Sequence, residues 1–297
     1  MQIANIDRIL YFKHEGDPNS SPVTTMPEFQ ARYGFDPDGV NFYVGLSSSA
    51  RSVLVSEGGR GLNMTHRAFF NSVVDALPGD GTPKRVILGL EPLQASDPFG
   101  YVHDNLDWVR EIATELHAIQ DQATASGKNL EIVLRFASEM NDRGNKTYGH
   151  RPDEFKAIFP EVRQAFRDQA PGIRFCFSPA IRVDLDESEI TQYWPGDGLV
   201  DIMSGTWYVG ENTDFATAAD NMRRYVLHRL PRGLPFALDE MGGRGSLGND
   251  PMLRMMFRHL RSLSVAHPVQ FEYVTVFIDT VRWGETATLD FLITGVL

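Results

Sequence analysis

Cysteine and lysine are scarce in this sequence. Cys176 is the one cysteine in 297 residues, so no disulfide can form within the chain. It lies in the apolar run 173–177, which predicts a buried thiol. Lysine occurs only at positions 13, 84, 128, 146 and 156, and none of these ends a predicted strand. A Schiff-base aldolase needs a lysine at such a strand end, so the sequence argues against that class.

Positive charge and long apolar runs are also lacking. The formal net charge is −11, which argues against nucleic acid or an anionic membrane as a partner. No run of about eighteen apolar residues predicts a membrane span. The N-terminus has no basic start followed by a long apolar stretch, so no signal peptide is visible. We expect a cytoplasmic protein, or a secreted or periplasmic one whose targeting segment has been removed.

Short apolar runs alternate with longer amphipathic stretches along the chain. Eight runs predict strands, at 5–12, 40–46, 85–90, 131–137, 173–178, 200–207, 234–238 and 271–278. Helical periodicity falls at 64–77, 101–126, 152–169, 214–230 and 250–266, with short helices expected at 26–33 and 187–193. Eight βα units predict an α/β fold with a single closed (β/α)8 barrel and long βα loops, a single domain over 1–297. An open doubly wound sheet is the alternative, but its G-x-G-x-x-G turn is absent.

Two of the predicted strands lead directly into a glutamate. Glu139 lies in the segment 134–141, and Glu240 lies in the segment 235–242. The C-terminal ends of barrel strands carry the chemistry of such enzymes. Two carboxyl groups there could flank a glycosidic bond, at about 5–5.5 Å for a retaining mechanism or about 6.5–9.5 Å for an inverting one.

Residues near the two glutamates have predicted supporting roles. Strand alternation places Arg135 on the same inward face as Glu139, and a buried arginine there needs a carboxylate, for which Glu240 is the natural partner. We expect Arg135 to keep the pKa of Glu240 low, while Glu139 stays protonated as the acid. Alternatively, Arg135 and Glu139 form a purely structural ion pair that fills the barrel.

Three further candidates lie at predicted strand ends. Glu91 follows the third strand and could bind substrate hydroxyls, orient its neighbours or serve only the structure. Tyr208 could donate a hydrogen bond to the nucleophile, and Trp207 could stack on a sugar ring. Ordinary packing is the alternative for both aromatic residues.

Three segments resemble glycoside hydrolase family 26, which contains the β-mannanases, within the clan of retaining (β/α)8 glycosidases. They are RFASEMN at 135–141, YWPGDGLVDIMSGTWY at 193–208 and PFALDEMGG at 235–243. The resemblance implies Glu139 as acid/base within a motif that includes Asn141, Tyr208 as the tyrosine that touches the nucleophile, and Glu240 as the nucleophile. The chain departs from the family at Ser138, where a histidine is usual, and at Trp283, which is out of register with the family's eighth-strand tryptophan.

The remaining classes lack their signatures. The eight histidines are scattered, with no H-x-H and no H-E-x-x-H, so we expect neither a metal nor a cofactor. No G-x-S-x-G elbow is present. The sequence thus predicts a monomeric retaining endo-glycosidase acting on mannan, xylan, β-glucan or a bacterial exopolysaccharide. A catalytically decayed carbohydrate-binding barrel and a polysaccharide lyase stay as alternatives.

Overall fold

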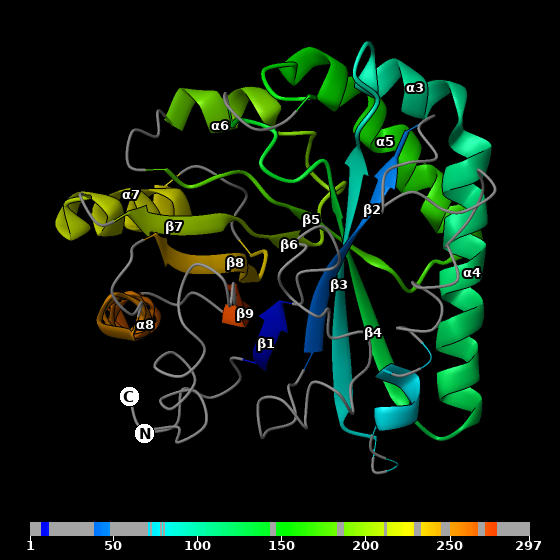
Figure 1. The fold of residues 1–297 in the computed structure, drawn as a ribbon, viewed down its shortest axis with the longest axis horizontal. Helices are drawn as coiled ribbons and strands as arrows, with labels where there is room; N and C mark the ends of the chain where they lie inside the picture. The colour runs from blue at the N-terminus through cyan, green and yellow to red at the C-terminus, as the bar shows by residue number, and fades with distance from the viewer. Residues whose placement is uncertain are drawn as a thin grey trace, which may run out of the picture.

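Parallel strands form one closed sheet in the computed structural model (Figure 1). The structure describes residues 7–11, 39–47, 71, 73–77, 79, 81–142, 147–182, 187–210, 213–228, 233–244, 250–266 and 271–277. Its strands are β1 Asp7–Tyr11, β2 Gly39–Leu46, β3 Pro83–Pro92, β4 Asn129–Phe136, β5 Arg174–Phe177, β6 Ile202–Met203, β7 Thr206–Gly210, β8 Phe236–Arg244 and β9 Phe271–Phe277.

The strand order closes the sheet into a barrel. Neighbours follow the order β6-β5-β4-β3-β2-β1-β9-β8-β7, every pair is parallel, and β6 also pairs with β8 through Met203 and Phe236. β6 and β7 together take the place of the sixth predicted strand. The predicted (β/α)8 architecture is confirmed.

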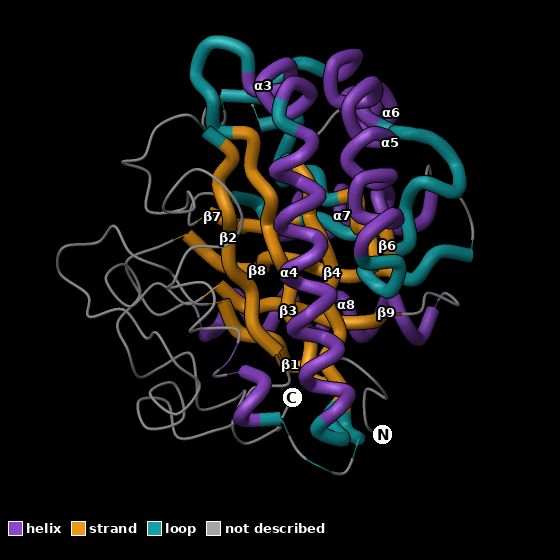
Figure 2. The backbone as a smooth tube through the Cα atoms, turned by 90° about the vertical axis from the view of Figure 1, so that its right-hand side faces the viewer, coloured by secondary structure: helices purple, strands orange, loops and turns teal. Residues whose placement is uncertain are grey.

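Helices cover the outside of the barrel. They are α3 Pro98–Asp104, α4 Leu106–Ala125, α5 Pro152–Gln169, α6 Glu187–Tyr193, α7 Phe215–His228 and α8 Asp250–Ala266. α4 packs on β4 and on α5, while α7 and α8 lie beside β7 and β8 (Figures 1 and 2). In the part of the chain that the structure describes, no helix has the length and apolar character of a membrane span.

Two elements differ from their sequence predictions. The helix predicted at 101–126 is two helices, because the Asn105 side chain donates to the Tyr101 carbonyl at 2.7 Å and competes with regular backbone pairing. The strand predicted at 200–207 breaks at Ser204 and Gly205. A Cβ on Gly205 would lie 2.6 Å from Ile181 Cδ1 and 3.1 Å from Pro179 O, so glycine allows the close approach of the β5–α6 connection.

Other predicted segments are only partly described. Of the helix predicted at 64–77, residues 71 and 73–76 are described and helical. The short helix predicted at 26–33 lies outside the described residues, whereas the one at 187–193 is α6.

Apolar side chains form two layers. A small cluster fills the barrel interior with one residue from each of six strands: Ile87, Val133, Cys176, Ile202, Ala237 and Tyr273. The larger cluster lies between the strands and the helices. Since side chains alternate along a strand, membership of one cluster or the other tells which way each residue faces.

Candidate active site

Strand β8 turns two consecutive carboxylates into the barrel. Ala237 belongs to the interior cluster, whereas Leu238 and Met241 belong to the outer layer. Leu238 pairs with Val274 and Met241 with Val276 on β9, so β8 has one residue more than its partner over this stretch. This bulge breaks the alternation, and both Asp239 and Glu240 therefore face inward.

Two donors hold the carboxylate of Glu240. Arg135 Nη1 donates to Oε1 at 2.8 Å, and the Tyr208 hydroxyl donates to Oε2 at 2.6 Å. Both are contacts that the sequence predicts. Arg135 is fully buried on β4 and the Glu240 side chain is 10% exposed, so the pair lies almost out of water. The two donors fix the orientation of the carboxylate plane.

The electrostatics of Glu240 differ from the prediction. Burial raises the pKa of Glu240 to about 8, because the charged form loses its hydration inside the barrel. Burial also opposes the charge on Arg135, yet the carboxylates of Asp239, Glu91 and Glu139 raise the pKa of that guanidinium. Arg135 thus keeps its positive charge, but its proximity does not give Glu240 the low pKa that we predicted from the sequence.

Glu139 reaches the barrel mouth through a left-handed turn. The prediction assumed that β4 continues to this residue, but β4 ends at Phe136. Ala137 and Glu139 have φ values of 50° and 55°, a region that costs a non-glycine residue roughly 1–2 kcal/mol. Backbone bonds to neighbouring strands hold the turn, from Ala137 N to Leu90 O at 3.0 Å and from Glu139 N to Ser178 O at 2.8 Å.

Strand β7 connects the two glutamates. The Thr206 hydroxyl donates to Glu139 Oε1 at 2.6 Å, and Thr206 is also the register partner of Glu240. Tyr208, which donates to Glu240, comes two residues later on the same face of β7, about 6.6 Å along the strand. Donors at alternate positions of one strand therefore bring both carboxylates to the same site. Sequence reasoning missed Thr206, although its spacing from Tyr208 is visible in the sequence.

A buried carboxylate lies behind the turn that carries Glu139. Glu91 is 2% exposed and accepts hydrogen bonds from the Ser138 hydroxyl at 2.6 Å and from the Tyr148 hydroxyl. Tyr148 also donates to the carbonyl of Ser138 at 2.8 Å. Ser138 and Glu91 thus fix the backbone beside Glu139, and both side chains are buried.

Comparison with known proteins adds the fold family. No protein-family model and no curated protein matches the sequence. Among solved structures, the chain is similar to a modular endo-β-1,4-mannanase of family 26 from Cellulomonas fimi, at 15% identity over 99% of this chain and 71% of that one, with a TM-score of 0.67. The family 26 β-mannanase BoMan26A from Bacteroides ovatus is 15% identical over 98% of this chain and 88% of that one, with a TM-score of 0.63. An endo-β-1,4-mannanase of the same family from Bacillus sp. JAMB-750 is 15% identical over 92% of this chain and 77% of that one, with a TM-score of 0.60.

The chain has the fold of the family 26 mannanases. At this level of identity the likeness establishes the fold alone. The resemblance inferred from the three sequence segments is confirmed to that extent.

Two of the predicted supporting residues, Asn141 and Trp207, make structural contacts away from the two glutamates. Asn141 exchanges hydrogen bonds with the backbone of Ala180, at 3.0 and 2.7 Å, and so ties the turn after β4 to the connection after β5. Trp207 is 1% exposed and faces outward from β7, because it alternates with Thr206 and Tyr208. It packs on Phe215 and His259, so a sugar-stacking role does not fit this position. Trp283 lies outside the described residues.

Tyr43 is a site residue that the sequence did not single out for this role. Its hydroxyl accepts from Arg135 Nη1 at 2.8 Å, and its ring centroid lies 5.5 Å from the guanidinium carbon. Tyr43 pairs in register with Gly89 on β3, where a Cβ would lie 2.1 Å from Tyr43 Cδ1. The absence of a side chain at Gly89 therefore makes room for the ring that supports Arg135.

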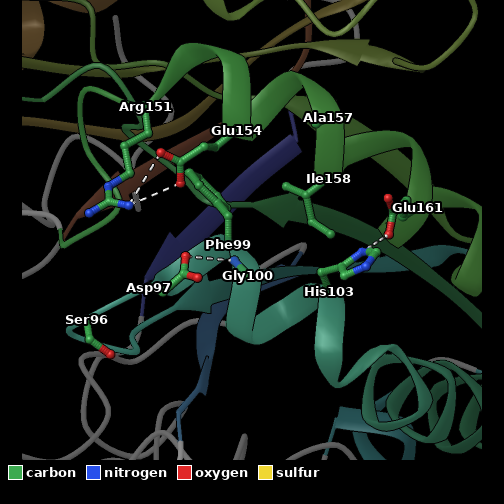
Figure 3. A pocket seen from close by; sticks show the side chains of 10 residues that line it. All are labelled: Ser96, Asp97, Phe99, Gly100, His103, Arg151, Glu154, Ala157, Ile158 and Glu161. Atoms are coloured by element: carbon green, nitrogen blue, oxygen red, sulfur yellow. Dashed lines mark hydrogen bonds and ion pairs between the residues drawn. The ribbon is translucent and has the colours of Figure 1, made fainter.

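A separate hollow of about 600 Å³ lies between α3 and α5 (Figure 3). Phe99 and Ile158 form apolar wall, while His103 with Glu161 and Arg151 with Glu154 form ion pairs. Neither glutamate of the site lines it. Within the described residues, no group of three or more histidine, cysteine or acidic side chains is arranged to hold a metal ion.

Proposed function

We propose that this protein is a retaining glycoside hydrolase that cleaves a β-linked polysaccharide internally. The observation that carries the proposal is the pair of glutamates held by donors from one face of β7, Tyr208 on Glu240 and Thr206 on Glu139, with Arg135 of β4 as a second donor to Glu240. The similarity to solved endo-β-1,4-mannanases supports the choice of a polysaccharide substrate. Mannan is therefore the first polymer to test, followed by xylan, β-glucan and bacterial exopolysaccharides.

The proposed reaction is a double displacement. A carboxylate oxygen of Glu240 attacks the anomeric carbon, the bond to the leaving oxygen breaks, and Glu139 gives that oxygen its proton. Water then attacks the glycosyl-enzyme, Glu139 takes a proton from it, and the bond to Glu240 breaks. Glu240 must be ionised to attack, so we expect the activity to rise as the pH passes through about 8.

The decisive test combines a substrate panel with product stereochemistry. Viscosity and reducing ends are followed together, because internal cleavage lowers viscosity long before many ends form. Proton NMR of the first product should show the same anomeric configuration as the substrate. An inverted product contradicts the double displacement, and an unsaturated product identifies a lyase. Binding without any cleavage identifies a carbohydrate-binding barrel.

Gly89→Ala is expected to lower activity by about 10²-fold, the effect of misplacing a catalytic contact by about 1 Å. The new methyl group would overlap the Tyr43 ring, which must move away from Arg135. Steady-state rates and thermal unfolding measure the effect. Gly172→Ala is the matched control, since its Cβ meets nothing within 4 Å. Equal activity of the two variants would show that Tyr43 does not position Arg135.

A further inference from the structure

Asp239 is a second carboxylate on the same arginine, and it is fully buried. Arg135 Nε lies 3.3 Å from Asp239 Oδ2. Tyr273 donates to Oδ1 at 2.6 Å, and Ser204 donates to Oδ2. The Cys176 thiol is 3.6 Å from Oδ2. Tyr273 and Ser204 thus donate hydrogen bonds to Asp239, and the guanidinium of Arg135 lies beside it.

Arg135 therefore lies between two acids that are adjacent in the sequence. Its Nη1 donates to Glu240 and Tyr43, and its Nε donates to the Ser178 hydroxyl at 3.3 Å and lies 3.3 Å from Asp239 Oδ2. The bulge in β8 creates this arrangement, because regular alternation would send one of the two acids outward. One guanidinium thus faces two carboxyl groups, in a place that water barely reaches.

We propose that Asp239 is a positioning residue of the active site. It partly offsets the positive charge that Arg135 presents to Glu240, and so sets the pH above which Glu240 can act as nucleophile. This inference rests on the proposed function for its catalytic meaning, but the charge sharing itself does not need a substrate. None of the roles implied by the family 26 resemblance includes an acid at this position.

The sign of the effect follows from the charges around both acids. The carboxyl group of Asp239 lies beside Arg135 and offsets its charge, so little net positive charge is left for Glu240 and burial dominates the pKa of Glu240. Without Asp239, the full positive charge of Arg135 would face Glu240 and lower its pKa. The other titratable groups that face this cluster are Tyr208 on β7, Tyr225 on α7, Tyr273 on β9, Cys176 on β5, and Glu91 and Glu139, whose charges act on Arg135.

The test is Asp239→Asn, which keeps the shape and removes the charge. We expect the acidic limb of kcat/KM to move to a pH lower by about one to three pH units, as expected for a carboxylate beside an uncompensated cation. The titration of Glu240 is measured in parallel by ¹³C NMR of labelled glutamate, with Glu240→Gln to assign the signal. Ser178→Ala is the control, because it removes a neutral partner of Arg135 and should leave the midpoint in place.

A purely structural role for Asp239 would lower activity at every pH and leave the midpoint unmoved, and that result would overturn the proposal. If Asp239→Asn does not fold, Asp239→Ser serves instead. It also removes the charge, so the Glu240 midpoint should again move downward, and an unmoved or raised midpoint overturns the proposal. If the NMR midpoint shifts in the expected direction but no polysaccharide is cleaved, the proposed function fails and the charge sharing stands.

Discussion

Glu240→Gln is expected to lower the rate of polysaccharide cleavage by about 10⁴-fold or more, the size of effect seen when a covalent nucleophile is removed. The amide cannot form the glycosyl-enzyme, although it can still meet Arg135 and Tyr208. Initial rates on the substrate identified by the panel give the effect. Glu272→Gln is the matched control, since Glu272 is half-buried and also pairs with arginines, Arg85 and Arg174, but on β9 near the opposite end of the barrel.

Azide separates the roles of the two glutamates. In Glu240→Ala, azide can occupy the vacated space and attack the anomeric carbon directly, which gives a glycosyl azide of inverted configuration. In Glu139→Ala, azide attacks the intact glycosyl-enzyme of a substrate with a good leaving group, and the glycosyl azide keeps the configuration of the substrate. The opposite assignment of the two products would mean that the roles of Glu139 and Glu240 are exchanged.

Arg135→Met is expected to lower the free energy of unfolding by about 3–5 kcal/mol at neutral or higher pH, the usual result of removing one partner of a buried ion pair. Asp239 loses its neighbouring cation, and Glu240 loses one of its two donors. Chemical denaturation from pH 4 to pH 9 measures the loss. It should shrink at low pH, because protonated carboxyl groups no longer need a compensating charge.

Arg110→Met provides the baseline for that experiment. Arg110 pairs with Asp107 one turn away on the exposed side of α4, where such a pair contributes about 0.5 kcal/mol or less. A loss for Arg135→Met that is equal at pH 4 and pH 9 would assign the effect to packing rather than to uncompensated charge.

Periodicity was enough to predict the barrel, because continuously apolar runs and helical repeats report directly on burial. All eight predicted strands correspond to strands of the structure, with one of them divided at Ser204 and Gly205. That division depends on the approach of Ile181 to Gly205, a contact between segments more than twenty residues apart. The residues next to Gly205 in the sequence do not predict such a contact.

The site was predicted in part. Strand alternation placed Arg135 inward and next to Glu240, as the structure has it. The same rule placed Glu139 at the barrel mouth for the wrong reason, because β4 ends three residues before Glu139 and a left-handed turn follows. The sequence did not single out Asp239, because alternation alone cannot predict the bulge that turns it inward beside Glu240. The pKa of Glu240 was misjudged because burial, and not the presence of an arginine, decides it.

The extra residue in β8 also limits how this strand can change in length. Most substitutions in a strand affect only the replaced side chain and its neighbours. Deleting a single residue between Leu238 and Met241 would instead restore regular pairing with β9 over this stretch. Only one inward position would then remain where Asp239 and Glu240 now lie. One acidic side chain would then have to serve both as the partner of Arg135 and as the proposed nucleophile. We therefore expect point mutations to be tolerated here far more readily than deletions.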